Sequence, residues 1–154
     1  MYLQYKGISL GALVAASLYS DYNIDVGFTY NRKEAKDHGE GGILVGSAIS
    51  NRRILIVDDV ITAGTAIRES HTLLTKCGGI PIGVVIALDR AEKKSLEEPL
   101  SAVQSVEKEL NIPVVSIVSL PQLQSFLECG GVSDEYSSDD ILGKIVEYRR
   151  MYGV

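Results

Sequence analysis

The sequence predicts a doubly wound α/β fold, in which a mainly parallel β-sheet is flanked by helices. Three apolar runs with the length of strands carry this prediction, and they lie at residues 53–60, 82–88 and 114–120. A run that is apolar throughout is typical of a strand buried on both faces of a parallel sheet. A helical pattern at 65–77 lies between the first two runs, and strands that alternate with helices favour parallel pairing.

The remaining elements follow from the same kinds of pattern. The segment from Ile8 to Tyr19 is apolar on nearly every face, which predicts a helix buried against the sheet. Charged residues fill 31–42 and 92–99, so these segments are expected to be connections. Further strands are expected at 24–30 and 43–49, and further helices at 121–129, where Pro121 begins the helix, and at 139–151.

Length and composition fit one globular domain that spans residues 1–154. Hydrophobic residues make up 45% of the chain and charged residues 23%, which are the proportions of a protein with a packed core. The net charge of −5 argues against unselective nucleic-acid binding, although a few focused cations could still bind an anion. No apolar run is long enough to cross a bilayer, so no membrane role is expected.

Cys77 and Cys129 are the two cysteines of the chain, and they show no metal-ligand spacing with its two histidines. We expect both cysteines to be buried and reduced, as in a cytoplasmic protein. The apolar stretch after Lys6 has a faint likeness to a signal peptide. Gly7 and the tyrosines near it favour instead a loop that leads into a helix.

The segment 54–66, ILIVDDVITAGTA, carries the strongest functional signal. A buried strand delivers two adjacent carboxylates, Asp58 and Asp59, to its carboxyl end, where ligands bind in parallel sheets. The turn TAGT then begins a helix, and a helix N-terminus attracts phosphate through its N–H groups and its dipole. The glycine of this turn allows the backbone to approach an anion, and its threonines add hydroxyl donors.

Two acids beside a phosphate site are compatible if the acids face a sugar. Carboxylates accept hydrogen bonds from ribose hydroxyls, directly or through a Mg²⁺ that also neutralises a diphosphate. The segment therefore predicts a site for a phosphorylated ribose. The alternative is a solvated strand end followed by an ordinary helix cap, which fits either half of the segment alone but not the combination. A Walker phosphate loop is excluded because GxxxxGK is absent, and a Rossmann fingerprint is also missing.

The charged segment NRKEAKDHGEGG, from Asn31 to Gly42, is formally neutral, and a solvated surface loop is its default interpretation. Its cationic or protonatable groups, followed by glycines, also suit a lid that closes over a diphosphate and stabilises its leaving charge. These groups are Arg32, Lys33, Lys36 and His38.

Segment 54–66 resembles the motif that binds phosphoribosyl pyrophosphate (PRPP) in type I phosphoribosyltransferases. The charged segment together with VGSA resembles the catalytic loop of orotate phosphoribosyltransferases, and YKGI at 5–8 and ALDR at 87–90 resemble two further parts of that family. The resemblance implies orotate-binding roles for Thr62 and Arg90. It implies that PRPP is bound by Tyr5, Lys6, Arg32, Lys33, Lys36, His38, Asp58, Asp59, Val60, Ile61, Thr62, Ala63, Gly64, Thr65 and Ala66.

The resemblance also implies a reaction, in which ribose 5-phosphate passes from PRPP to orotate in pyrimidine (UMP) biosynthesis. The products would be orotidine 5′-monophosphate and pyrophosphate. Lys36, Asp58 and Asp59 would be the catalytic residues. Mg²⁺ would be held mainly through PRPP and without direct protein ligands, with the two aspartates contributing through water. Family members are homodimers in which the loop that corresponds to 31–42 reaches into the neighbouring subunit's site.

The match to the family is less complete near the N-terminus. Relatives carry an additional hood segment that helps to hold orotate and that this sequence does not show, and no strand is recognised before Tyr5. The PRPP half of the predicted site is therefore essentially complete, and the orotate half is partial. A truncated form with impaired activity, a non-catalytic PRPP or nucleotide-binding regulator, and a transferase for a purine base stay open as alternatives. The lysine-rich loop argues against the regulator, and Arg90 argues against a purine.

Overall fold

The computed structural model describes residues 2–3, 7–36, 42–93, 99–130 and 138–154. The strands are β1 (Tyr2–Leu3), β2 (Thr29–Lys36), β3 (Gly42–Gly46), β4 (Arg53–Val60), β5 (Ile80–Asp89) and β6 (Val114–Ser119). The helices are α1 (Ile8–Tyr22), α2 (Thr65–Lys76), α3 (Ala102–Leu110), α4 (Leu120–Glu128) and α5 (Ser138–Tyr152).

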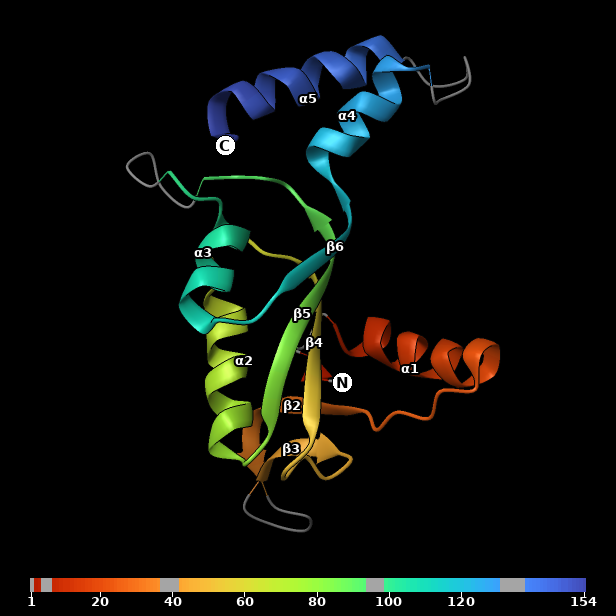
Figure 1. Cartoon of the computed structure of the whole chain (residues 1–154), viewed down its shortest axis with the longest axis vertical. Coiled ribbons are helices and arrows are strands. Elements are labelled where there is room, and N and C mark those ends of the chain that lie inside the picture. The colour runs from red at the N-terminus through yellow and green to blue at the C-terminus, as the bar shows by residue number, and fades with distance from the viewer. Residues whose placement is uncertain (1, 4–6, 37–41, 94–98, 131–137) are drawn as a thin grey trace.

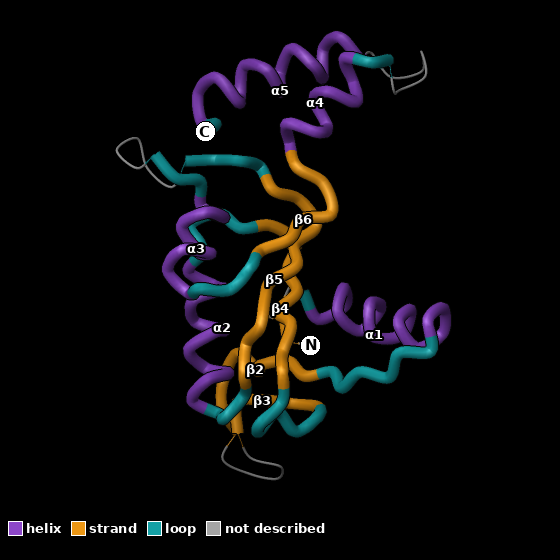
Figure 2. Tube along the Cα trace, in the orientation of Figure 1, coloured by secondary structure: helices purple, strands orange, loops and turns teal. Residues whose placement is uncertain are grey.

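The strands form one sheet in the order β3-β2-β1-β4-β5-β6. Strand β3 runs antiparallel to β2, and the other neighbouring pairs are parallel. Helices α2 and α3 lie on one side of the sheet and α1 on the other, while α4 and α5 lie beyond the end of β6 (Figure 1). Figure 2 shows β4 and β5 as long central strands between these helices. The prediction of an α/β fold with a mainly parallel sheet is confirmed.

The hydrophobic core lies between the sheet and the side that carries α2 and α3. Ile54, Ile56 and Ile86 on the strands are at most 2% exposed. They belong to one buried cluster with Leu74 of α2 and Val106 of α3, both 0% exposed. Because successive side chains of a strand point to opposite faces, every second residue of β4 and β5 faces these helices.

The opposite face of the sheet is only partly covered. Leu55 of β4 is 37% exposed, and Val115 and Ile117 of β6 are 58% and 80% exposed. Helix α1 lies on this side but projects away from the sheet (Figure 1), so that Gly11 is buried whereas Leu13 is 66% exposed. The predictions of strands buried on both faces and of a buried first helix were therefore wrong. An apolar pattern shows which residues can be covered, not what covers them.

Several element boundaries also differ from those expected. Strand β2 begins only at Thr29, where pairing with the two-residue strand β1 starts. It continues to Lys36 as a hairpin with β3, although this segment was expected to be a loop. Strand β1 itself precedes Tyr5, where no strand was recognised. Helix α3 was not expected either, although Ser101 and Gln104 form a capping box at its start.

Cys77 and Cys129 are both exposed and unpaired, so the prediction that they are buried was wrong. Each cysteine is the C-cap residue of a helix, Cys77 of α2 and Cys129 of α4. A helix end that passes into a loop lies at the surface, because the loop backbone needs water or other partners for its polar groups.

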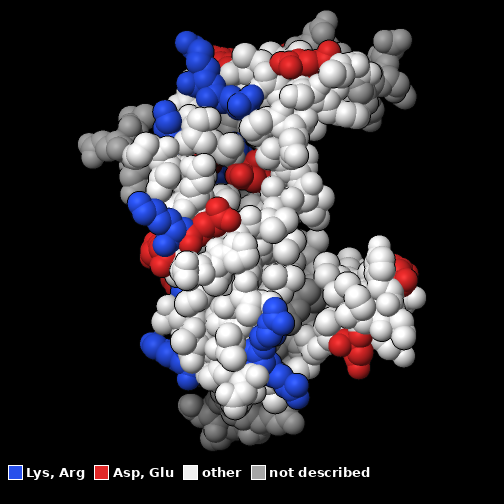
Figure 3. All heavy atoms as spheres, viewed as in Figure 1, with Lys and Arg blue, Asp and Glu red and all other residues white. Residues whose placement is uncertain are grey.

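The surface in Figure 3 carries acidic and basic side chains in small interspersed groups, without a broad basic area on the face in view. On this face, no continuous positive potential would attract a polyanion. Among the described residues, no helix combines the length and the apolar character needed to span a membrane.

Leu74 anchors α2 to the sheet, because its side chain is 0% exposed. We expect Leu74→Ala to lower the free energy of unfolding by roughly 2–5 kcal/mol, through lost burial and the cavity left behind. Leu13→Ala, at a leucine that is 66% exposed, is the matched control and should change this free energy by less than about 0.5 kcal/mol. Urea unfolding followed by circular dichroism measures both variants. Equal losses of unfolding free energy in the two variants would contradict the conclusion that the core lies around Leu74.

Candidate functional site at the carboxyl ends of β4 and β5

Asp58 and Asp59 lie at the carboxyl end of β4. Both residues are half-buried, and Ile61 shortly after them is 5% exposed. The Asp58 carboxylate accepts a hydrogen bond of 2.9 Å from the backbone N–H of Asp59, and the Asp59 carboxylate accepts one of 2.9 Å from the N–H of Val60. These bonds orient both carboxylates relative to the backbone, and the two adjacent acids place negative charge at this end of the sheet.

A turn of small residues joins β4 to α2. Gly64 has φ of 77° and ψ of 4°, in the left-handed region that favours glycine. A Cβ at this position would lie 2.5 Å from Cγ2 of Val106, so the close packing against α3 also requires glycine. The exposed residues Thr62, Ala63 and Thr65 surround it at the N-terminus of α2. The positive end of the helix dipole favours an anion there.

Arg68, near the start of α2, holds this turn in place. Its Nη1 donates a hydrogen bond of 2.7 Å to the carbonyl of Ala63, and its Nε lies 2.7 Å from Oε2 of Glu109 on α3. The Arg68 side chain is 22% exposed and that of Glu109 is 51% exposed, so the pair lies at the protein surface. Sequence reasoning missed this residue, because Glu109 lies 41 positions further along the chain and no local pattern connects the two.

Arg90 follows β5 at the same edge of the sheet. Val60 pairs with Leu88 in the parallel β4–β5 ladder, so the turns after these two residues begin side by side. Nη2 of Arg90 lies 3.0 Å from Oε2 of Glu92, and the Arg90 side chain is 29% exposed. The structure thus brings the two carboxylates, the TAGT turn and Arg90 to one edge of the sheet, as the sequence predicted.

The cationic segment is placed differently from the other predicted site residues. Arg32, Lys33 and Lys36 lie on β2. The side chains of Lys33 and Lys36 lie outside the described part of the structure, as do Tyr5, Lys6 and His38. In Figure 1 the β2–β3 hairpin lies at the lower end of the molecule's long axis, whereas the β4–α2 turn lies higher, beside α3. Within one chain, the described end of β2 is therefore separated from the two carboxylates.

Comparison with known proteins decides the family. A model described as the phosphoribosyl transferase domain matches residues 3–119. An orotate phosphoribosyltransferase of Acinetobacter baumannii (strain AB307-0294) is 47% identical over 150 residues, covering 97% of this chain and 66% of the relative. That of Vibrio vulnificus (strain YJ016) is 49% identical over 150 residues, covering 97% of this chain and 67% of the relative. The chain belongs to the phosphoribosyltransferase family.

This phosphoribosyltransferase chain spans 66% of the length of the first of these relatives. The crystal structure of an orotate phosphoribosyltransferase from Francisella tularensis matches it with a TM-score of 0.77 at 33% identity, over 99% of this chain and 68% of that chain. An orotate phosphoribosyltransferase from Mycobacterium tuberculosis H37Rv, in complex with PRPP, has a TM-score of 0.57 at 24% identity and covers 79% of this chain and 64% of that chain. The second likeness concerns the fold alone.

The candidate site offers two adjacent carboxylates, Asp58 and Asp59, as possible contacts for a metal ion. Among the described residues, no group of three or more His, Cys, Asp or Glu side chains could hold a metal ion. Asp58 and Asp59 each accept a backbone hydrogen bond. Mg²⁺ usually keeps several waters and binds through one or two carboxylates plus substrate phosphates. The residues present therefore fit a Mg²⁺ that is held mainly through a diphosphate.

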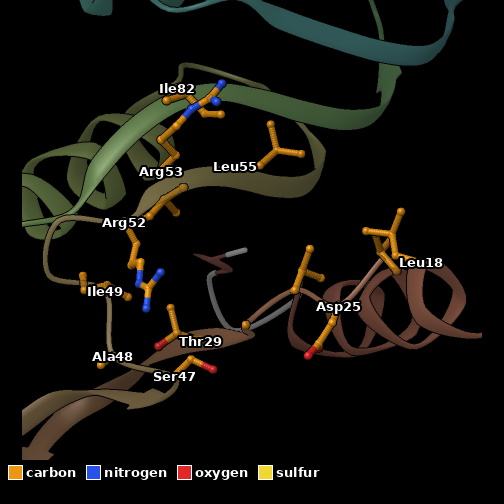
Figure 4. A pocket seen from close by; sticks show the side chains of 14 residues that line it. Leu18, Asp25, Thr29, Ser47, Ala48, Ile49, Arg52, Arg53, Leu55 and Ile82 are labelled. Carbon is orange, nitrogen blue, oxygen red and sulfur yellow. The ribbon is translucent and has the colours of Figure 1, made fainter. Parts of the chain in front are cut away.

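A large cavity lies away from this site, at the other end of β4. Its volume is about 760 Å³, and its walls come from α1, the start of β4 and the segments before β2 and after β3. Figure 4 shows Arg52 directed toward Thr29 and Ser47, and Arg53 extending toward Ile82. The candidate site lies instead at the carboxyl ends of the strands, where the segment 54–66 places its carboxylates and the TAGT turn. The cavity belongs to the incompletely covered face of the sheet.

Gly64→Ala tests the shape of the turn, with Gly130→Ala as its matched control. The two glycines have φ of 77° and 76°, but a Cβ at Gly130 would meet nothing within 4 Å. We expect Gly130→Ala to lower the free energy of unfolding by about 1 kcal/mol, from left-handed backbone strain. Gly64→Ala should lower it by roughly 2–4 kcal/mol, because overpacking against α3 adds to that strain. Equal losses in urea unfolding would show that α3 does not constrain the turn.

Proposed function

We propose that this protein is an orotate phosphoribosyltransferase, which transfers ribose 5-phosphate from PRPP to orotate in the synthesis of pyrimidine nucleotides. One observation carries the proposal: the two carboxylates and the TAGT turn lie beside Arg90 at one edge of the sheet. The carboxylates suit ribose hydroxyls, the helix N-terminus suits the 5′-phosphate, and the guanidinium suits the carboxylate of orotate. The names of the relatives support orotate as the base.

In the proposed reaction, the bond between the ribose carbon and pyrophosphate breaks, a ring nitrogen of orotate bonds to that carbon, and the proton of that nitrogen is released. The sugar becomes oxocarbenium-like, and Asp58 and Asp59 hold its hydroxyls beside the developing positive charge. The turn of Thr62, Ala63, Gly64 and Thr65, with its neighbours Val60, Ile61 and Ala66, holds the 5′-phosphate through backbone N–H groups and hydroxyls. Arg90 and Thr62 hold the orotate.

The leaving pyrophosphate carries the charge that must be stabilised in this step. Lys36 is the proposed catalytic cation, because a fixed positive charge beside a leaving group stabilises the transition state more than the ground state. When bound, Mg²⁺ neutralises part of the diphosphate charge. The other proposed pyrophosphate ligands are Tyr5, Lys6, Arg32, Lys33 and His38.

We further propose a homodimer in which segment 31–42 of one subunit completes the site of the other. The separation between the end of β2 and the β4–α2 turn within one chain supports this arrangement (Figure 1). Cations on a hairpin that lies away from its own carboxylates can still act on a diphosphate that a second subunit holds. We place the protein, as one domain of residues 1–154, in the cytoplasm, where exposed and unpaired cysteines stay reduced.

Orotate consumption in the presence of PRPP and Mg²⁺ tests the activity, with adenine and hypoxanthine as alternative bases. We expect consumption of orotate alone, because neither purine carries the carboxylate that Arg90 would bind. Arg90→Ala should lower kcat/KM for orotate roughly 10- to 100-fold, since it removes a charge-assisted pair. Arg150→Ala, at an exposed arginine of α5, is the matched control. PRPP binding without turnover of any base would contradict the proposed catalytic activity and would favour a non-catalytic PRPP-binding regulator.

Mixing two inactive variants tests the shared site. In a mixed dimer of Lys36→Ala and Asp59→Asn chains, one site would carry both substitutions and the other would carry neither. Co-refolding equal amounts should therefore restore roughly a quarter of the unmutated turnover, because half of the dimers are mixed and each has one intact site. Asp58→Asn mixed with Asp59→Asn is the control, and it should restore nothing, because every site keeps a defect. No recovery from the first pair would rule out loop sharing.

A further inference from the structure

Arg90 lies in a turn whose shape does not come from its own residues alone. Ala91, the next residue, has φ of 50°, in the left-handed region that residues with a side chain rarely adopt. The N–H of Ala91 donates a hydrogen bond of 2.8 Å to Oδ1 of Asp89. Since the left-handed conformation is unfavourable for alanine, contacts from elsewhere in the fold must hold it in place.

Glu92 connects Arg90 to the C-terminal helix. One of its carboxylate oxygens, Oε2, lies 3.0 Å from Nη2 of Arg90. The other, Oε1, accepts a hydrogen bond from the hydroxyl of Tyr148 on α5. The Glu92 side chain is 17% exposed, so both interactions are largely shielded from water. The Glu92 carboxylate is thus held by Arg90 on one side and by Tyr148 on the other. The position of the Arg90 guanidinium therefore depends on the position of α5.

The backbone of the C-terminus reinforces this connection. The N–H of Lys93 donates to the carbonyl of Tyr152 at 2.9 Å, and the N–H of Val154 donates to the carbonyl of Ala91 at 3.0 Å. Glu92 and Gly153 form the antiparallel bridge between these bonds. A Cβ at Gly153 would lie 2.6 Å from the carbonyl oxygen of Arg149, so this close approach requires glycine. The backbone of residues 152–154 is therefore hydrogen-bonded to the turn that carries Arg90.

The Tyr148 ring packs beside that of Tyr152, with centroids 5.0 Å apart, and it also borders a cavity. A cavity of about 300 Å³ lies between α5 and the end of β5, and its lining includes Leu88, Arg90, Ile145 and Tyr148. Where side chains border empty space, rotamers are set less firmly by packing. The hydrogen bond to Glu92 therefore adds to the ring packing in fixing the position of the Tyr148 hydroxyl.

We propose that Glu92 and Tyr148 are positioning residues for recognition of the base, and that α5 thereby sets the specificity of the site. The inference rests on the proposed function, in which Arg90 binds the carboxylate of orotate. A guanidinium binds a carboxylate bidentately only when the two groups lie in one plane. A partner on one amino group of the guanidinium fixes the orientation of that plane. A guanidinium carries five N–H donors, and the ion pair with Glu92 uses Nη2, so Glu92 leaves donor capacity on Arg90.

Binding of two ligands by calorimetry separates this role from a general effect on the fold. Orotidine 5′-monophosphate probes both halves of the site, whereas ribose 5-phosphate probes only the half at Asp58 and the TAGT turn. We expect Tyr148→Phe and Glu92→Gln to raise the Kd of orotidine 5′-monophosphate roughly three- to tenfold, because one hydrogen bond or one ion pair is lost. The Kd of ribose 5-phosphate should stay within about twofold, and the KM for orotate should rise without a rise in that for PRPP.

Tyr152→Phe is the matched control, because Tyr152 is 51% exposed and its ring packs beside that of Tyr148 with centroids 5.0 Å apart. It removes a hydroxyl from the same helix and should leave the Kd values of both ligands unchanged. Equal weakening of both ligands by Tyr148→Phe, or no change in either Kd, would overturn the positioning role. A different result, in which the unmutated protein binds both ligands equally well, would show that the base adds nothing and would overturn the proposed function itself.

Discussion

The parallel pairing of β4 with β5 is the constraint on which the site depends. Val60 lies opposite Leu88, so the two strands end at almost the same level and their turns share one edge of the sheet. A slip of one residue would move Ile56 or Ile86 from the core to the other face and would carry the following turn with it. The contacts that bury the core therefore also decide which side chains meet at the proposed substrate site.

The packed face of the sheet shapes the turn that is proposed to bind the phosphate. Gly64 fits against Val106 of α3, and Arg68 joins the carbonyl of Ala63 to Glu109 on the same helix. Helix α3 thus holds the turn through one steric contact and one ion pair, although it contributes no predicted ligand. A preformed anion site needs such support, because its backbone groups must stay oriented before the ligand arrives.

The sequence predicted the features that lie within one continuous segment, but not the contacts between residues far apart in the chain. The Asp58–Asp59 pair and the turn after it form one continuous segment, so strand, acids and helix start could be predicted together, as could the α/β fold. The contact between Arg68 and Glu109 spans 41 residues, and only the packing of α2 on α3 creates it. The exposure of α1 could not be predicted either, because hydrophobic periodicity does not reveal whether another surface covers the helix.

The two halves of the proposed site are supported by different parts of the fold. The half for the phosphorylated ribose rests on α2 and α3, whereas the turn of Arg90 rests on α5, through a contact between Glu92 and Tyr148 that spans 56 residues. A change in the packing of α5 would therefore act first on the guanidinium, whereas a change in α3 would act first on the TAGT turn. The two halves still share the β4–β5 ladder, in which Val60 pairs with Leu88, and they share Thr62, which is proposed to contact both the phosphate and the orotate. Recognition of the base and recognition of the sugar phosphate are therefore expected to be coupled, because groups with shared partners do not act independently.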